Sequence, residues 1–247
     1  MGELVLVGET RMRRRVNVLT SVGGAVDRSL LADQAYEAIR KEILNGSYPP
    51  GAWLRIEPLA QKLGVSIVPV REALTRLVGD GLLEKFPHVG FRVKVFTKEE
   101  IVEVYELRCA LEKYAAGLAA RRILPEEIRA LEELHKAMVS LAQSRNGLVK
   151  FHEYNQEFHS RLIRAAKNKY LEKMALEIAL KVEFLVGRAA HIPGRIQQAL
   201  GEHQAILEAV KEGNVDQSQV LMEEHLIRAL EDLLSWWEEQ RGDSGGE

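Results

Sequence analysis

The sequence predicts a mainly α-helical chain in two parts: a three-helix module closed by a β-hairpin, and an antiparallel bundle of six to seven helices. Apolar residues recur at steps of three and four over most of the chain and alternate only around one short segment that contains Pro and Gly. The charge also divides near residue 97. Residues 1–97 hold 14 Lys and Arg against 10 Asp and Glu, and the remainder holds 20 against 26. The resulting net charges of +4 and −6 indicate that the two parts meet different partners.

The composition excludes several classes of protein. The chain has 247 residues, of which 46% are apolar and 28% charged, enough to bury a core in one or two domains. Its single cysteine, Cys109, cannot form an internal disulfide or a thiolate zinc site, so we expect a cytoplasmic protein. No apolar stretch approaches the roughly 20 residues of a membrane helix, and the N-terminus lacks an apolar signal core. We therefore expect no membrane partner and no secretion.

The first 97 residues are expected to form a tail and one small module. Residues 1–28 show no sustained period and are expected to be a flexible tail with a solvated Arg13–Arg15 cluster. The module over residues 29–97 begins with a helix, and Trp53-Leu54 can form a short apolar entry to the second helix. Glycine and turn residues delimit its main elements, which are helices over 29–44, 58–63 and 67–79 and strands over 82–85 and 91–95.

These elements in this order are typical of a winged helix-turn-helix. Ser66 is a good N-cap for the third helix, whose N-terminal end is left free to enter a DNA major groove about 12 Å wide. The first amides of that helix and Arg71 would meet phosphates or base edges. The hairpin tip around His88 would lie toward an adjacent groove or the backbone. The alternative is a small packing module without DNA contact.

The second part is expected to be a helical domain over residues 98–241, followed by a flexible tail over 242–247. Thr97 with Glu100 three residues later predicts a capping box at its start. A bundle of this kind can place a ligand among inward-facing side chains. Pro, Gly and Asn residues separate six helices, expected over 98–122, 125–144, 147–166, 168–190, 194–212 and 215–240.

Three histidines interrupt otherwise apolar helical faces, namely His159, His203 and His225. Asn155 precedes His159 by one helical turn, so both side chains project from the same face. Neutral imidazoles from three helices and one oxygen donor could hold a divalent ion. The alternative is that each histidine is an ordinary hydrogen-bonded residue. The spacing alone does not decide between these interpretations, because a local signature such as His-Glu-x-x-His is missing.

Arg108 lies on a largely apolar helix face and could receive a ligand carboxylate through two hydrogen bonds. The alternative is an ion pair with Glu112, four residues on. The sequence leaves both interpretations open.

Together, these residues resemble the GntR family of bacterial transcription regulators, in the FadR-type subfamily whose C-terminal part is an FCD domain. The resemblance covers about residues 29–240 and is most specific between Leu63 and Leu74. The residues that carry it in the first part are Gly51–Leu54, Leu59–Ser66, Pro69–Leu74, Gly81–Leu83 and Gly90-Phe91. Those in the second part are Leu107-Arg108, Leu111-Glu112, Asn155, Phe158-His159, Glu202–Ile206 and Glu224–Leu226.

The resemblance implies a dimer that binds a pseudo-palindromic operator and responds to a small carboxylate metabolite. Many FCD members hold a metal with one Asp or Asn and three His, and zinc or nickel is the expected ion. The matching positions here are Asn155, His159, His203 and His225, and Arg108 is the expected effector-binding residue. Asn in place of the commoner Asp removes one negative charge, which lowers the expected metal affinity.

The resemblance also implies DNA contacts, with two departures from the family pattern. The expected contact residues are Ser66, Ile67, Val68, Pro69, Arg71, Arg76, His88 and Gly90. Ile67 and Val68 stand where the family usually has Arg and Thr, and Val89 stands where a basic residue is common. Because Ile offers only apolar contact where Arg can bind guanine, the usual operator core should not be assumed.

The sequence therefore predicts a cytoplasmic, dimeric, ligand-responsive transcription factor, a repressor rather than an enzyme, that holds a divalent metal ion. Two alternatives remain. One is a metal-dependent helical-bundle enzyme, which would need a general base that the sequence does not place beside the histidines. The other is a regulator whose metal-free bundle serves only dimerisation.

Overall fold

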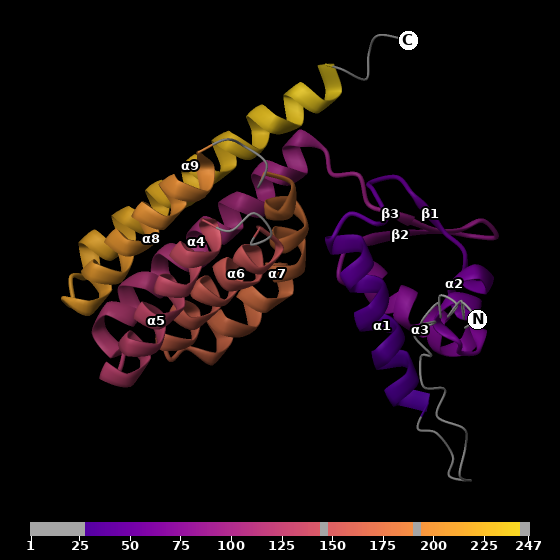
Figure 1. The fold of residues 1–247 in the computed structure, drawn as a ribbon, viewed down its shortest axis with the longest axis horizontal. Coiled ribbons are helices and arrows are strands. Elements are labelled where there is room, and N and C mark those ends of the chain that lie inside the picture. The colour runs from indigo at the N-terminus through magenta and orange to yellow at the C-terminus, as the bar shows by residue number, and fades with distance from the viewer. Residues whose placement is uncertain (1–27, 144–147, 190–193, 243–247) are drawn as a thin grey trace, which may run out of the picture.

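The computed structural model describes residues 28–143, 148–189 and 194–242. Figure 1 shows the two predicted parts, with α1 to α3 and a small sheet at one end and a bundle of α4 to α9 beside them. This confirms the fold class predicted from the sequence. The tails expected over 1–28 and 242–247 lie outside the described residues, apart from Arg28, which begins α1, and Gly242, which ends α9.

The N-terminal module is a winged helix-turn-helix. Its helices are α1 (Arg28–Leu44), α2 (Ile56–Leu63) and α3 (Ile67–Gly79). Gly64 adopts a left-handed conformation with φ 69°, which ends α2 and allows the short turn into α3. The apolar positions of α1 and α3 face each other in a core that contains Ile39, Ile43, Val70, Ala73, Leu74 and Leu77.

The wing is a three-stranded antiparallel sheet rather than a two-stranded hairpin. β2 (Leu83–Phe86) pairs with β3 (Gly90–Val93), and β1 (Trp53–Leu54) pairs with the other edge of β3. The short apolar entry expected at Trp53-Leu54 is thus the third strand, with Leu54 opposite Phe91. Gly90 is needed here because a Cβ at its φ of 141° would lie 3.1 Å from the carbonyl oxygen of Leu54.

The C-terminal part is a helical bundle. The capping box at Thr97 is confirmed, because its side chain accepts from the Glu100 amide and the Glu100 carboxylate accepts from the Thr97 amide. None of the helices in the described ranges is both long and apolar enough to cross a membrane. The six helices are α4 (Lys98–Arg122), α5 (Pro125–Ala142), α6 (Leu148–Ala165), α7 (Lys169–Ala189), α8 (Arg195–Lys211) and α9 (Val215–Gly242).

One apolar core joins the two parts. The core of the N-terminal module continues into Tyr105 of α4, Phe184 of α7 and Leu233 of α9. An ion pair of 2.6 Å between Arg40 of α1 and Glu183 of α7 lies across the same junction. The bundle therefore holds the DNA-binding module through three of its own helices.

Candidate metal centre and nucleic-acid interface

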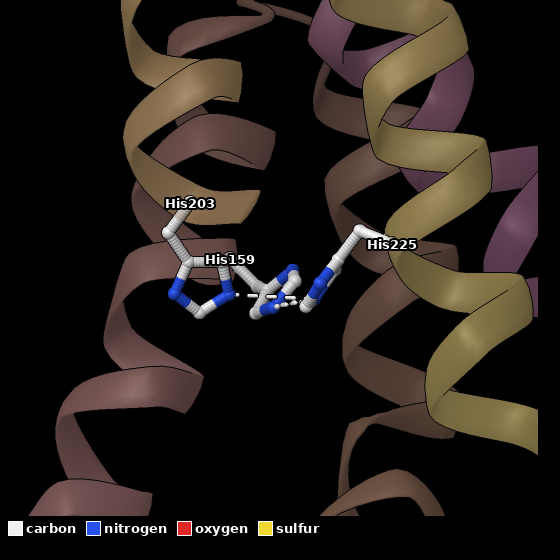
Figure 2. Close-up of side chains that lie close together, drawn as sticks. All are labelled: His159, His203 and His225. Carbon is white, nitrogen blue, oxygen red and sulfur yellow. Dashed lines mark hydrogen bonds between the residues drawn. The ribbon is translucent and has the colours of Figure 1, made fainter. Parts of the chain in front are cut away.

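Three histidines from separate helices meet inside the bundle. His159 of α6, His203 of α8 and His225 of α9 are each at most 3% exposed. Figure 2 shows their rings turned toward one another. The Nε2 atom of His225 lies 3.3 Å from Nε2 of His203 and 3.3 Å from Nε2 of His159. The three ligand nitrogens all lie within 4.8 Å of one another, so the structure brings together the histidines that the sequence singled out.

Local helical geometry explains why these side chains point inward. Phe158, Ile206 and Met222 are buried in one apolar cluster around the histidines, so each histidine belongs to the core-facing side of its helix. Asn155, one turn before His159 on α6, is also buried. Its position is therefore consistent with the oxygen donor that the sequence predicted, although its role as a ligand stays a prediction.

Carboxylates fix the outer nitrogens of two rings. Nδ1 of His159 lies 2.5 Å from Oε2 of Glu112, and Nδ1 of His225 lies 2.6 Å from Oε2 of Glu202. A carboxylate accepts the proton of Nδ1–H, which leaves the lone pair on Nε2 of both rings. The two Nε2 atoms that face each other at 3.3 Å are then both acceptors. Such an arrangement suits a shared cation, and carboxylate-bound imidazoles are the usual support of metal-ligating histidines.

Burial keeps the imidazoles of His203 and His225 in the neutral form that binds a metal. Burial, together with the neighbouring His225 and His159, lowers the pKa of His203 well below its usual value. Burial also lowers the pKa of His225 to about 4, although the hydrogen bond to Glu202 acts in the opposite direction. Near pH 7 these rings therefore need no deprotonation before they bind a cation.

Arginines hold the two carboxylates in their charged form. Burial alone would raise the pKa of Glu112, but Arg108 and His159 outweigh it and hold that pKa well below the usual range. For Glu202, burial is likewise outweighed by His225 and by Arg195 and Arg228, so its pKa falls to about 2. Both carboxylates are thus ionised hydrogen-bond acceptors over the whole neutral range.

The residues present fit a divalent ion of the zinc type. In a tetrahedral site with metal–nitrogen distances of about 2.0–2.1 Å, neighbouring nitrogens lie about 3.3 Å apart, as two nitrogen pairs do here. Neutral imidazoles are ligands that zinc and nickel accept. Among the described residues, Nδ1 of His203 is buried with no hydrogen-bond partner, and its ring stacks on Phe158. That ring is therefore held by packing rather than by a carboxylate.

Arg108 is buried beside this site. Its side chain is 2% exposed, and its Nε donates to Oε1 of Glu112 over 2.7 Å. The ion pair that the sequence left as an alternative is therefore present. The guanidinium also lies 5.4 Å from the ring centre of Tyr105. An effector carboxylate would have to bind Arg108 while Glu112 occupies its Nε, so the effector role stays a prediction.

The N-terminal end of α3 is exposed, as a DNA-reading helix requires. Ile67 and Val68 are 43% and 48% exposed, and Arg71 is exposed on the next turn. Ser66 has the extended backbone of an N-cap, but its side chain makes no capping hydrogen bond. The hydroxyl group expected to cap the helix is therefore not used in that way.

Two of the predicted DNA-contact residues are engaged within the protein itself. Pro69 is buried with Val70 because it lies on the core-facing side of α3, and its contact with DNA stays a prediction. Arg76 lies in the last turn of α3, paired with Asp33 over 2.5 Å and stacked 4.3 Å from the Tyr36 ring centre. Its guanidinium is thus bound to α1, and a role on DNA would require it to leave Asp33.

The wing places its tip in solvent. His88 is exposed at the hairpin turn with a positive φ of 60°, and Val89 beside it is also exposed. Gly90 begins β3 directly after them. The tip is therefore available for a backbone contact to DNA, while its side chains offer little positive charge.

The sequence does not reveal the residues that support the candidate metal centre. The sequence indicates Glu112 as a partner of Arg108 and, like Glu202, as part of the family resemblance, but indicates neither as a support for a histidine. Arg195 and Asp232 form an ion pair of 2.7 Å beside Glu202, and no pattern in the sequence points to either residue. The signals available were the Arg108–Glu112 spacing and the position of Glu202 directly before His203. Neither signal reveals which histidine on another helix each carboxylate meets.

Comparison with known proteins agrees with this architecture. The family model described as bacterial regulatory proteins, gntR family, matches residues 31–93, and the FCD domain model matches residues 103–228. The probable D-xylose utilization operon transcriptional repressor of Paenarthrobacter nicotinovorans is 33% identical over 206 residues, which cover 82% of this chain and 88% of that protein. The uncharacterized HTH-type transcriptional regulator YdhC of Bacillus subtilis (strain 168) is 30% identical over 206 residues, which cover 81% and 89% respectively.

A solved structure shares the fold. The E. coli protein McbR/YncC aligns with a TM-score of 0.72 at 23% sequence identity, over 84% of this chain and 98% of that one. The chain belongs to the gntR family of bacterial regulatory proteins, with an FCD domain as its C-terminal part, and is a transcriptional regulator rather than an enzyme.

Proposed function

We propose that this regulator is a cytoplasmic, dimeric repressor that binds a pseudo-palindromic operator and responds to a small carboxylate metabolite in a metal-containing bundle. The observation that supports it best is the buried set of three imidazoles with facing Nε2 atoms, attached through a shared core to a winged helix-turn-helix. Repression is proposed by analogy with the relative from Paenarthrobacter nicotinovorans, whose name describes a probable operon repressor.

Asn155, His159, His203 and His225 would hold the ion, which we propose to be zinc or nickel. Glu112 and Glu202 keep two of the imidazoles oriented, with Nδ1 protonated and Nε2 directed inward. A divalent ion bound there would supply positive charge that attracts a carboxylate oxygen of the effector.

Arg108 would receive the other part of the effector. Its guanidinium has five N–H donors, of which Nε–H donates to Glu112, and the donors of its terminal nitrogens would receive the carboxylate. The helix that carries Arg108 also contributes Tyr105 to the core shared with the DNA-binding module. Effector binding would therefore bias the placement of that module, and operator DNA would change effector affinity by the same factor.

On DNA, the N-terminal end of α3 would enter the major groove. Arg71 would contact a phosphate or a base edge, and Ile67 and Val68 would make apolar contacts such as that to a thymine methyl. The wing tip with His88 and Gly90 would meet the backbone. Two copies related by a two-fold axis would read the two half-sites of the operator.

Titration of the protein against fragments of DNA upstream of its own gene, at several salt concentrations, tests DNA binding. We expect one fragment to bind at least about 10³-fold more tightly than random DNA. Arg71→Ala should weaken specific binding and leave the oligomeric state unchanged. The proposal fails if no fragment binds more tightly than random sequence. Arg40→Ala is the matched control, because Arg40 pairs with Glu183 away from α3.

Elemental analysis of protein purified without a histidine tag tests the metal centre. We expect about one divalent ion per chain, and its loss in His203→Ala. His135→Ala is the matched control, because His135 is also buried on a bundle helix but is bonded to the Leu200 carbonyl group at 2.9 Å. Protein that stays metal-free after incubation with zinc or nickel salts, yet still binds its operator, would establish the alternative of a metal-free dimerisation bundle.

A further inference from the structure

The exposed face of α3 is apolar at its N-terminal end and charged only beyond it. Ile67 and Val68 begin the helix and are 43% and 48% exposed. Arg71 and Glu72 follow one turn later on the same face and bring one charge of each sign. The part of α3 that would enter a groove first therefore presents hydrocarbon to the base edges, and the turn behind it has no net charge.

The other exposed polar side chains of α3 are engaged within the protein. Thr75 donates its hydroxyl proton to the carbonyl oxygen of Arg71 over 2.8 Å, and Arg76 pairs with Asp33 of α1. Among the exposed residues of α3, this leaves the side chains of Arg71 and Glu72 to form hydrogen bonds with bases. Apolar contact must therefore supply a large part of the discrimination between base pairs.

Hydrocarbon side chains find one distinctive partner in the major groove. The base edges offer hydrogen-bond donors and acceptors, which Ile and Val cannot use, and the C5 methyl group of thymine. A cytosine that is methylated at C5 presents the same hydrocarbon at the same position of the ring. An apolar surface therefore selects 5-methylpyrimidines as a class, whether the methyl group belongs to thymine or to 5-methylcytosine.

We propose that Ile67 and Val68 determine operator specificity by contact with the C5 methyl groups of pyrimidines, so that methylation of a cytosine at a contacted position strengthens binding. The inference rests on the proposed function, because it requires α3 to enter the major groove of an operator. It goes beyond that function by making the affinity for DNA depend on cytosine methylation. Burial of one methyl group favours binding about fourfold, and two half-sites together give about 15-fold.

Removal of single methyl groups from the DNA tests this contact. Selection of binding sites from a pool of random duplexes first gives the operator sequence, and each thymine of its half-sites is then replaced by uracil, which lacks only the methyl group. At a contacted position, replacement in both half-sites should raise the dissociation constant about 15-fold in fluorescence anisotropy. Thymines in the spacer between the half-sites are the control, because the two recognition helices leave the spacer uncontacted, and their replacement should have no effect.

A second set of duplexes distinguishes the two sources of the methyl group. It places a cytosine–guanine pair at the contacted position, with or without a methyl group at C5 of cytosine. The methylated duplex should bind about 15-fold more tightly than the unmethylated one, because the same hydrocarbon is added as in the step from uracil to thymine. A preference for thymine over uracil without a preference for methylated cytosine would overturn the inference.

Protein variants test whether α3 makes the contact. The double variant Ile67→Ala, Val68→Ala should bind the thymine and uracil operators with nearly equal dissociation constants. Arg71→Ala is the matched control on the same face: it should weaken binding to both operators and keep the wild-type ratio between them. The three side chains are exposed, so these changes should leave the fold intact, which circular dichroism checks. A wild-type ratio in the double variant would overturn the assignment to Ile67 and Val68.

The outcomes separate this inference from the proposed function. A chain that enriches no sequence from the random pool overturns both. A chain that binds its selected operator specifically, but accepts uracil at every thymine of the half-sites, overturns the recognition of methyl groups and leaves the proposed regulator in place.

Discussion

Replacement of Glu112 by Gln should destabilise the bundle far more than any comparable change on its surface. Glu112 is the shared partner of Arg108, at 2.7 Å, and of His159, at 2.5 Å. The side chains of Arg108 and Glu112 are 2% and 8% exposed. Loss of the carboxylate charge leaves the guanidinium buried without compensation, which costs about 3–5 kcal/mol. A domain stability of about 5–15 kcal/mol would be reduced by a large fraction.

Urea unfolding of metal-free protein, followed by circular dichroism, measures this effect. Glu157→Gln is the matched control, because Glu157 and Arg161 form an i,i+4 pair of 2.8 Å whose side chains are 36% and 34% exposed. That change should cost no more than about 1 kcal/mol, since water can solvate the remaining charge.

A double variant identifies the source of the loss. Arg108→Met combined with Glu112→Gln removes the unpaired charge and retains an amide oxygen that can accept from His159, so most of the lost stability should return. Equal stability of Glu112→Gln and the Glu157→Gln control, or a double variant less stable than the single one, would refute the reasoning.

Three further outcomes are expected. Removal of metal by a chelator should lower the melting temperature of the wild type but not of His203→Ala, by calorimetry, because only a folded site binds the ion. Tyr36 donates to Asp80 over 2.8 Å, and burial with Asp80 raises the pKa of Tyr36 to about 12. The phenol of the unfolded chain ionises near pH 10, so the contribution of Tyr36 to the free energy of unfolding is complete below pH 10 and is lost as the pH rises toward 12. Urea unfolding should show this decline in stability in the wild type and not in Tyr36→Phe. Thr97→Ala should lower the unfolding free energy by about 1 kcal/mol, and Thr97→Ser should retain most of it, in the same assay.

The local signals of the sequence predicted most of the fold. Gly64 ends a helix and the Thr97–Glu100 pair begins one, and each does so through contacts with residues only a few positions away in the sequence. Their effects can therefore be predicted without the rest of the molecule. The strand Trp53–Leu54 could not be recognised, because two residues have no period and this strand exists only through its pairing with Arg92 and Phe91. The burial of Pro69 follows from the helical period, because Pro69 lies one turn before the buried Ala73 of α3.

The candidate metal centre was only partly predictable, because its supporting contacts also join residues that are distant in the sequence. His159, His203 and His225 stand out because each interrupts an apolar face, and that contrast is visible in the chain itself. The pairing of Glu112 with His159 and of Glu202 with His225 joins different helices. Which carboxylate reaches which ring depends on helix rotation and axial offset, which are set by packing across the whole bundle.

The same packing determines how a ligand could act on the DNA-binding module. α4 carries Arg108 and, one turn earlier, Tyr105, which belongs to the shared core. α9 carries His225 and, about 12 Å farther along at 1.5 Å per residue, Leu233 of the same core. α8 carries His203, but none of its described residues belongs to that core. Because close-packed cores transmit displacement rather than absorb it, a ligand that shifts α4 or α9 must also move the surface on which the DNA-binding module rests, whereas a shift of α8 alone acts only indirectly.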